Sequence, residues 1–155
     1  MTSWRSLVAK LRGPRAAKPQ AILQVTNITR RTILATRLTK ADTPETRKKG
    51  LLGRSSLPPG EGLWIVPCQS IHMFFMRFPI DLVYIDRKHR VRKVRSNVKP
   101  WRISACLTAH SVLELPVGAV RDSGTQPGDV LEMAVAPTVT AAPASPAESP
   151  PILHS

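Results

Sequence analysis

The chain has 155 residues, of which 42% are hydrophobic and 21% charged, a composition typical of one globular domain and unlike that of a wholly disordered chain. Its 23 lysines and arginines outnumber its 10 aspartates and glutamates, for a formal net charge of +13. The sequence contains no run of about 18 apolar residues, which excludes a transmembrane helix, and its 15 prolines argue against an all-helical protein.

The beginning of the chain is basic, with five lysines and arginines and no acidic side chain in residues 1–20. Trp4, Leu7 and Leu11 fall on one stripe of a helix. We interpret this segment as a flexible leader, with docking on an anionic membrane surface or a partner as the alternative. Because no apolar stretch is long enough for a secretory signal peptide, we expect a cytoplasmic location.

The end of the chain, residues 136–155, is rich in proline and alanine and poor in large apolar side chains. Such a segment cannot offset the entropy of ordering by burial, so a disordered tail is predicted. A single β-rich domain over residues 21–135 remains, with 18 basic and 9 acidic side chains.

Strand patterns dominate this domain. Residues 21–29 and 31–41 are rich in isoleucine, valine and threonine, and the basic pair Arg30-Arg31 separates them as in a hairpin. Four further segments bounded by glycine, proline or aspartate read as strands: 62–67, 79–86, 111–117 and 129–135.

One short helix is predicted near residues 43–53. Asp42 with Glu45 three residues later resembles a capping box, Pro44 suits the first turn, and Gly53 suits the end. Many short strands with one helix favour a mostly β domain, built as a small antiparallel β-sandwich or a curled barrel.

The ordered segments LLGRSSLPPGEGLWI, SIHMFFMRFPIDLVYID, NVKPW, VLELPVG and PGD resemble the family called domain of unknown function 192, over about Leu23 to Met133. The resemblance implies a compact β-rich sandwich or curled barrel with the helix beside it. It implies no catalytic residue, because the family has none established. The family's recurrent positions fall on Gly50, Leu51, Arg54, Gly62, Met76, Asp81, Pro100, Leu113, Glu114, Leu115, Gly118, Gly128 and Asp129.

The segment from Ile71 to Asp81 holds all three phenylalanines and two of the four methionines. Strand alternation would send Met73, Phe75 and Arg77 to one face. The opposite face would carry His72, Phe74, Met76 and Phe78. One set fills the core, and the other either lines an apolar pocket or packs under neighbouring loops. The predicted ligand-binding residues are His72, Phe74, Met76, Arg77, Asp81 and Trp101.

His72 and Asp81 are also the weak candidates for catalysis. A carboxylate that accepts from an imidazole N–H raises the pKa of the imidazole and makes it a general base. The sequence contains no motif that marks a nucleophile, and Asp81 is equally suited to binding backbone N–H groups at a turn or strand start.

Two cysteines and two histidines share one spacing, and they are the weak candidates for a metal site: Cys68, His72, Cys106 and His110. Zinc accepts two cysteines and two histidines, but residues four apart on a strand lie roughly 13 Å apart. We therefore expect isolated packing thiols, no metal and no cofactor.

The most basic part of the domain runs from Arg87 to Arg102, with eight lysines and arginines and no acid. Val91, Val94 and Val98 break strict alternation, which suggests a bulged or bent edge strand. The row of cations either blocks edge-to-edge aggregation or binds anions, with Trp101 placed to stack on a base or sugar. The candidate anion-binding residues are Arg90, Arg92, Lys93, Arg95, Lys99 and Arg102.

The sequence therefore predicts a small non-enzymatic domain that binds a small-molecule ligand or a partner. Its basic rim favours an anionic partner, which could be nucleic acid, another polyanion or a membrane surface. The alternative is a hydrolase-like or metal-assisted enzyme centred on His72 and Asp81.

Overall fold

The computed structural model describes residues 20–137, so the predicted leader and most of the predicted tail lie outside the described residues. The elements in chain order are β1 (Leu23–Asn27), β2 (Thr32–Ala41), α1 (Pro44–Lys49), β3 (Glu61–Ile65), β4 (Ser70–His72), β5 (Ile80–Ile85), β6 (Val91–Val98), β7 (Ile103–Ala105), β8 (Ser111–Leu115), α2 (Ala119–Ser123) and β9 (Leu131–Val135). Within this part of the chain, no helix is long and apolar enough to cross a membrane.

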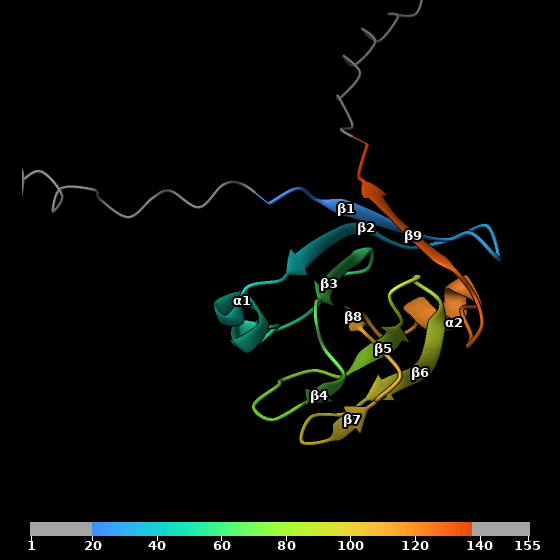
Figure 1. Cartoon of the computed structure of the whole chain (residues 1–155). Coiled ribbons are helices and arrows are strands. Elements are labelled where there is room, and N and C mark those ends of the chain that lie inside the picture. Colours follow the sequence, from blue (N-terminus) through green and yellow to red (C-terminus); the bar gives the residue numbers. More distant parts are fainter. Residues whose placement is uncertain (1–19, 138–155) are drawn as a thin grey trace, which may run out of the picture.

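Seven strands form one sheet in the order β6-β5-β8-β3-β2-β1-β9 (Figure 1). Every pairing in it is antiparallel except that of β2 with β3, which is parallel. The sheet curls so far that its two edge strands approach each other at one end, where Arg90 and Val130 form an isolated bridge. The predicted mostly β fold is confirmed, and of its two forms the structure adopts the curled one, a half-barrel.

The strands β5 and β8 are buried on both faces, because the curled sheet packs a core on each side. Inside the curl, Val83 and Leu113 pack together with Val120 of α2. On the outer side, Leu82 and Val112 belong to a second cluster. Alternation along the strands therefore assigns each buried side chain to one of two cores.

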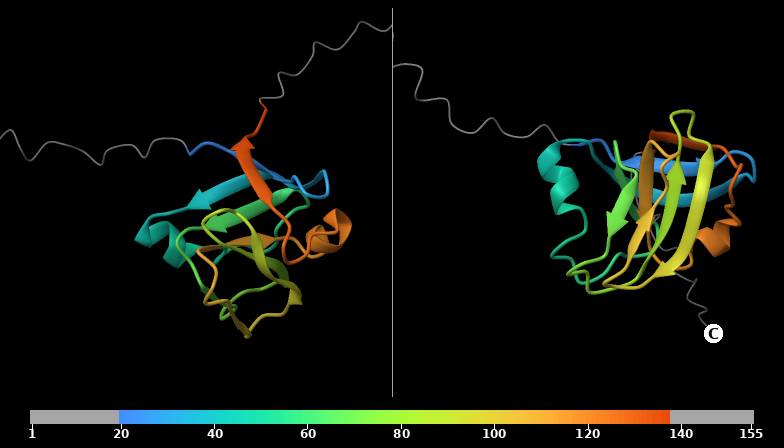
Figure 2. Two further views of the ribbon diagram at one scale, coloured as in Figure 1. Left: turned by 45° about the vertical axis from the view of Figure 1, so that its right-hand side comes forward. Right: turned by 60° about the horizontal axis from the view of Figure 1, so that its bottom comes forward.

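The outer core is covered by a separate two-stranded sheet of β4 and β7. Its inward-facing Ile71 and the following Met73 pack into the outer cluster. In Figures 1 and 2 this small sheet lies on the opposite side of the fold from β1 and β9, and α1 stands at the open end beside β3. The space between α1 and β4 is where the candidate pocket lies.

The predicted helix is confirmed but is shorter than expected. It ends at Lys49, and its N-cap is Thr43 and not Asp42. The Thr43 side chain accepts from the N–H of Thr46, and the Thr46 hydroxyl accepts from the N–H of Thr43, which completes a reciprocal capping box. A second helix, α2, was not predicted from the sequence.

The expected alternation after His72 is wrong, because the strand β4 ends there. Met73 is buried as the core requires, but Phe75, expected on the same face, is exposed. The predicted bent edge strand is present as β6, which lies at one edge of the sheet and pairs with β5 through two register shifts.

Candidate functional site

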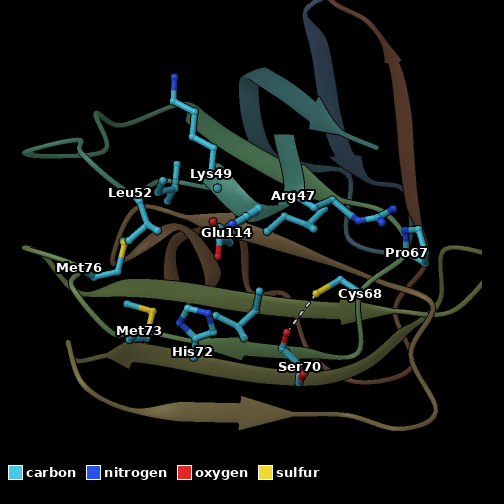
Figure 3. A pocket seen from close by; sticks show the side chains of 15 residues that line it. Arg47, Lys49, Leu52, Pro67, Cys68, Ser70, His72, Met73, Met76 and Glu114 are labelled. Atoms are coloured by element: carbon cyan, nitrogen blue, oxygen red, sulfur yellow. Dashed lines mark hydrogen bonds between the residues drawn. The ribbon is translucent and has the colours of Figure 1, made fainter. Parts of the chain in front are cut away.

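A pocket of about 190 Å³ lies between α1 and β4. Its walls come from α1 and the turn after it, from the segment between β3 and β4, from β4 itself and from β8 (Figure 3). The lining residues that matter chemically are Arg47, Lys48, Lys49, Cys68, His72 and Glu114.

Glu114 of β8 is the most unusual of these residues. Its side chain projects toward the outer core, and the residue is only 6% exposed. Its Oε2 has no hydrogen-bond partner, and none of the ion pairs within residues 20–137 includes it. Burial raises the pKa of Glu114 to about 7. An unpartnered buried carboxyl group costs folding free energy, so its position at a pocket marks a candidate binding site.

The rim of the pocket is cationic. Arg47 is anchored there, because its Nη1 donates to the carbonyl of Val66 at 3.4 Å. Lys48 and Lys49 are exposed, and Figure 3 shows Lys49 pointing away from Glu114 toward solvent. Negative charge on Glu114 would therefore lie inside the pocket, with positive charge at its opening.

One wall carries the thiol of Cys68, which donates to the carbonyl of Ser70 at 3.2 Å. Burial raises the pKa of this thiol, and the carboxyl group of Glu114 adds to that effect. A cysteine nucleophile needs a lowered pKa, so this environment does not activate Cys68.

A second feature is an aromatic cluster of His72, Phe74, Phe75 and Trp101 at one end of the β4–β7 sheet. His72 stacks on Phe74 with ring centroids 5.3 Å apart. Trp101 packs against Phe74 at 5.8 Å and against Phe75 at 5.1 Å. Phe75 is 72% exposed and Trp101 59% exposed, so much of this aromatic surface faces solvent.

Phe75 and Trp101 share a backbone conformation that large side chains rarely adopt. Their φ angles are +64° and +63°, in the left-handed region. The carbonyl of Met73 holds this arrangement, since it accepts from the N–H of Trp101 at 2.9 Å. Met73 in turn donates its own N–H to the carbonyl of Arg102 at 2.7 Å. Backbone bonds thus keep two strained residues side by side.

The candidate anion-binding residues divide into two groups. Three have intramolecular partners: the Arg90 guanidinium donates to the carbonyl of Gly128, Arg92 lies 3.9 Å from a carboxylate oxygen of Asp86, and Lys93 Nζ donates to the carbonyl of Ala105. The other three are exposed and have no ion pair or side-chain hydrogen bond within the described part of the chain: Arg95, Lys99 and Arg102. Lys99 lies two residues before Trp101 in sequence, and Arg102 follows it directly.

The ligand-binding residues predicted from sequence do not form one site. His72, Phe74 and Trp101 come together in the aromatic cluster, and Met76 lines the pocket that His72 also borders. Arg77 is exposed two residues beyond Phe75.

Asp81 is fully buried elsewhere, where it accepts backbone N–H bonds from Asn97, Gly118 and Val120. No hydrogen bond joins it to His72 among the described residues. The geometry supports the alternative role considered for Asp81, in which it binds backbone N–H groups, and provides no acid–base pair.

The four candidate metal ligands do not gather. Cys68 and Cys106 are free thiols that pack against the outer core. Only Cys68 and His72 line the pocket beneath α1. Over residues 20–137, no group of three or more histidine, cysteine, aspartate or glutamate side chains could hold a metal ion.

Sequence reasoning did not single out Glu114 or Phe75 as site residues. A signal for Glu114 was present, because it is the one acidic residue in the apolar run VLELPV. A charged residue inside a strand buried on both faces needs a partner or a function. No comparable signal marked Phe75, which strand alternation placed on the same face as the buried Met73.

Comparison with known proteins gives a family and a fold. The sequence model of DUF192, described as uncharacterized ACR, matches residues 25–133. Two UPF0127 proteins, from Thermococcus kodakarensis and Thermococcus gammatolerans, are 36% and 38% identical over 63 residues. Those residues make up 40% of this chain and 40% of each relative, so the match spans less than half of either protein.

Two solved structures share the fold. A protein of unknown function from Novosphingobium aromaticivorans aligns with a TM-score of 0.63 at 24% identity, over 81% of this chain and 96% of that one. A protein from Sinorhizobium meliloti, described as a candidate transcription regulator, aligns with a TM-score of 0.65 at 23% identity, over 77% of this chain and 98% of that one. At these identities the likeness concerns the fold.

Proposed function

The chain belongs to the DUF192 family, and we propose that on this β-rich scaffold it is a binding module that recognises single-stranded nucleic acid. Its aromatic cluster would stack on bases, and the neighbouring cations would bind phosphates. This proposal combines the basic rim and the aromatic residues His72, Phe74 and Trp101, all expected from the sequence, with Phe75, which sequence reasoning did not single out.

The observation that carries the proposal is the solvent exposure of the Phe75 and Trp101 rings, on two residues with left-handed backbone conformations. A non-glycine residue in the left-handed region costs on the order of 1 kcal/mol. Burial compensates little of that cost, since both side chains are more than half exposed. Strained residues cluster at binding sites, and an exposed ring contributes about 1–3 kcal/mol when a base stacks on it.

Charge supports the same partner. Residues 20–137 hold 18 basic and 9 acidic side chains, and the unpaired Lys99 and Arg102 lie within two residues of Trp101, with Arg95 six residues before it. Each phosphate that such a side chain neutralises releases counterions, so binding should weaken steeply as salt concentration rises.

The test uses the full-length chain and a fluorescein-labelled oligo(dT) of 15 nucleotides, followed by anisotropy at 50 and 200 mM salt. We expect saturable binding at 50 mM salt that weakens at 200 mM. Trp101→Ala should weaken it about tenfold or more through lost stacking. Arg102→Gln should weaken it and reduce the salt slope by about one.

Arg31→Gln is the matched control, because it removes the same charge from an exposed position at the β1–β2 turn. It should leave affinity nearly unchanged. The proposal fails if oligo(dT) does not bind at 50 mM salt, or if Trp101→Ala binds as tightly as the original chain. Binding of poly-glutamate with no binding of oligo(dT) would instead identify an acidic protein as the partner.

A further inference from the structure

We propose that the pocket beneath α1 is a separate ligand site for a small zwitterion, whose ammonium group contacts Glu114 and whose acidic group lies at the cationic rim. The inference is independent of the nucleic-acid surface. It rests on the buried, unpartnered carboxyl group of Glu114, on the cationic side chains of α1 that also line the pocket and on the apolar residues among the lining.

The floor of the pocket requires a hydrogen-bond donor. Oε2 of Glu114 is buried and has no partner in the protein. Position 114 lies between Leu113 and Leu115 on a strand whose other residues are buried, so an apolar side chain would satisfy packing alone. An ammonium group would donate to the carboxylate and compensate its charge, and charge-assisted hydrogen bonds are about twice as strong as neutral ones.

One side of the pocket is apolar. Leu51, Leu52, Met73 and Met76 line it, and thioethers adapt to a short carbon chain. The pocket volume of about 190 Å³ limits the ligand to a small molecule. A short carbon chain between the two charged groups matches this wall.

The rim selects for negative charge. Arg47 is held at the rim by the carbonyl of Val66, and Lys48 and Lys49 beside it are exposed. A simple amine would form an ion pair with Glu114 but none with the cations at the rim. A simple carboxylate would form an ion pair with the rim cations but would be repelled by the carboxylate of Glu114. A zwitterion satisfies both.

The ionisation of Glu114 makes the site sensitive to pH. The titratable groups that line the pocket with Glu114 are Arg47 and Lys48 from α1, Cys68 from the segment after β3 and His72 from β4. Lys49 also lines the pocket but points toward solvent (Figure 3), and Tyr84 of β5 lies near Glu114. An ammonium ligand binds the carboxylate and not the protonated acid. Since the pKa of Glu114 is about 7, affinity should rise between pH 6 and pH 8.

Thermal shift and calorimetry on the full-length chain test the site with four probes at 10 mM: 4-aminobutyrate, L-norleucine, butylamine and butyrate. We expect at least one of the two zwitterions to raise the melting temperature more than butylamine and butyrate do, and by more at pH 8 than at pH 6. Glu114→Gln should abolish this shift. Replacing Lys48 and Lys49 together by glutamine should reduce the zwitterion's shift to that of butylamine.

Glu132→Gln, at an exposed position on β9, is the matched control and should bind as the original chain does. Circular dichroism verifies that each variant folds. The inference is overturned if neither zwitterion binds, if butyrate stabilises as well as the zwitterions, or if Glu114→Gln binds them with unchanged affinity. Loss of oligo(dT) binding in Trp101→Ala has no bearing on these outcomes, so the two proposals fail separately.

Discussion

Asp81 and Gly118 are joined by a hydrogen bond of 3.0 Å, in which the backbone N–H of Gly118 donates to the Oδ2 atom of a fully buried carboxyl group. The same oxygen accepts from Val120 at 3.1 Å, and Oδ1 accepts from Asn97 at 2.8 Å. Asp81 therefore ties β5 to the first turn of α2 and to the end of β6.

This linkage predicts that Asp81 is a stability residue. Asp81→Ala leaves three backbone N–H groups without their acceptor, and we expect a loss of about 3 kcal/mol or more in the free energy of unfolding. Urea denaturation measures it. Asp42→Asn, which alters an exposed ion pair with Lys40, should change stability by less than about 1 kcal/mol. Equal effects of the two substitutions would contradict this role.

Because of Glu114, we expect the free energy of unfolding to fall as the pH rises through neutrality. Its pKa is raised from 4.5 to about 7 in the folded chain, so between these pH values the folded state holds a proton that the unfolded state has lost. Stability should therefore fall as pH rises from about 5 to 8, by about 3 kcal/mol from this group alone.

Glu114→Gln removes that titration. The variant should lose the downward slope between pH 5 and 8 and should be more stable than the original chain at pH 8. Urea titrations at four pH values measure the slope. A slope that persists in the variant would assign it to another group, and Glu132→Gln should leave it unchanged.

Substitution of Phe75 should weaken nucleic-acid binding while leaving the stability of the fold nearly unchanged. Asparagine tolerates a positive φ better than phenylalanine does, so Phe75→Asn should relieve strain of about 1 kcal/mol, offset in part by the lost contact with Trp101. We expect a melting temperature within a few degrees of the original and oligo(dT) binding weakened about tenfold. Loss of both properties would mean that the ring serves packing.

At Gly62, we expect the addition of a single methyl group to lower the stability of the fold. A Cβ atom there would lie 2.9 Å from side-chain carbons of Leu38 and Leu115 and 3.2 Å from the carbonyl of Glu114. Gly62→Ala should therefore destabilise by about 1–3 kcal/mol, since packed cores do not yield freely. Ser55→Ala, at an exposed position, should have little effect in the same thermal denaturation measurement.

Much of the fold was predictable because its signals are local. The hairpin of β1 and β2 follows from two runs of β-branched residues around Arg30-Arg31, and α1 follows from its capping residues. The stretch after His72 was not predictable, because its apolar residues suit a strand as well as a loop. The chain turns after Met73, where the N–H of Met76 donates to the carbonyl of Met73 and Phe75 has a positive φ, while backbone bonds hold Met73 to Trp101 and Arg102 almost thirty residues away.

The residues of the candidate sites likewise divide into those with local sequence signals and those that depend on distant contacts. By itself, the sequence determined a basic, β-rich domain with a cationic edge strand, because composition and alternation are properties of neighbouring residues. Only the tertiary structure gave three of the six candidate anion-binding residues carbonyl or carboxylate partners, placed Asp81 beneath α2, and set Glu114 in a pocket. Burial and hydrogen bonding depend on residues distant in the chain, and these contacts decide which polar side chains remain available to a ligand.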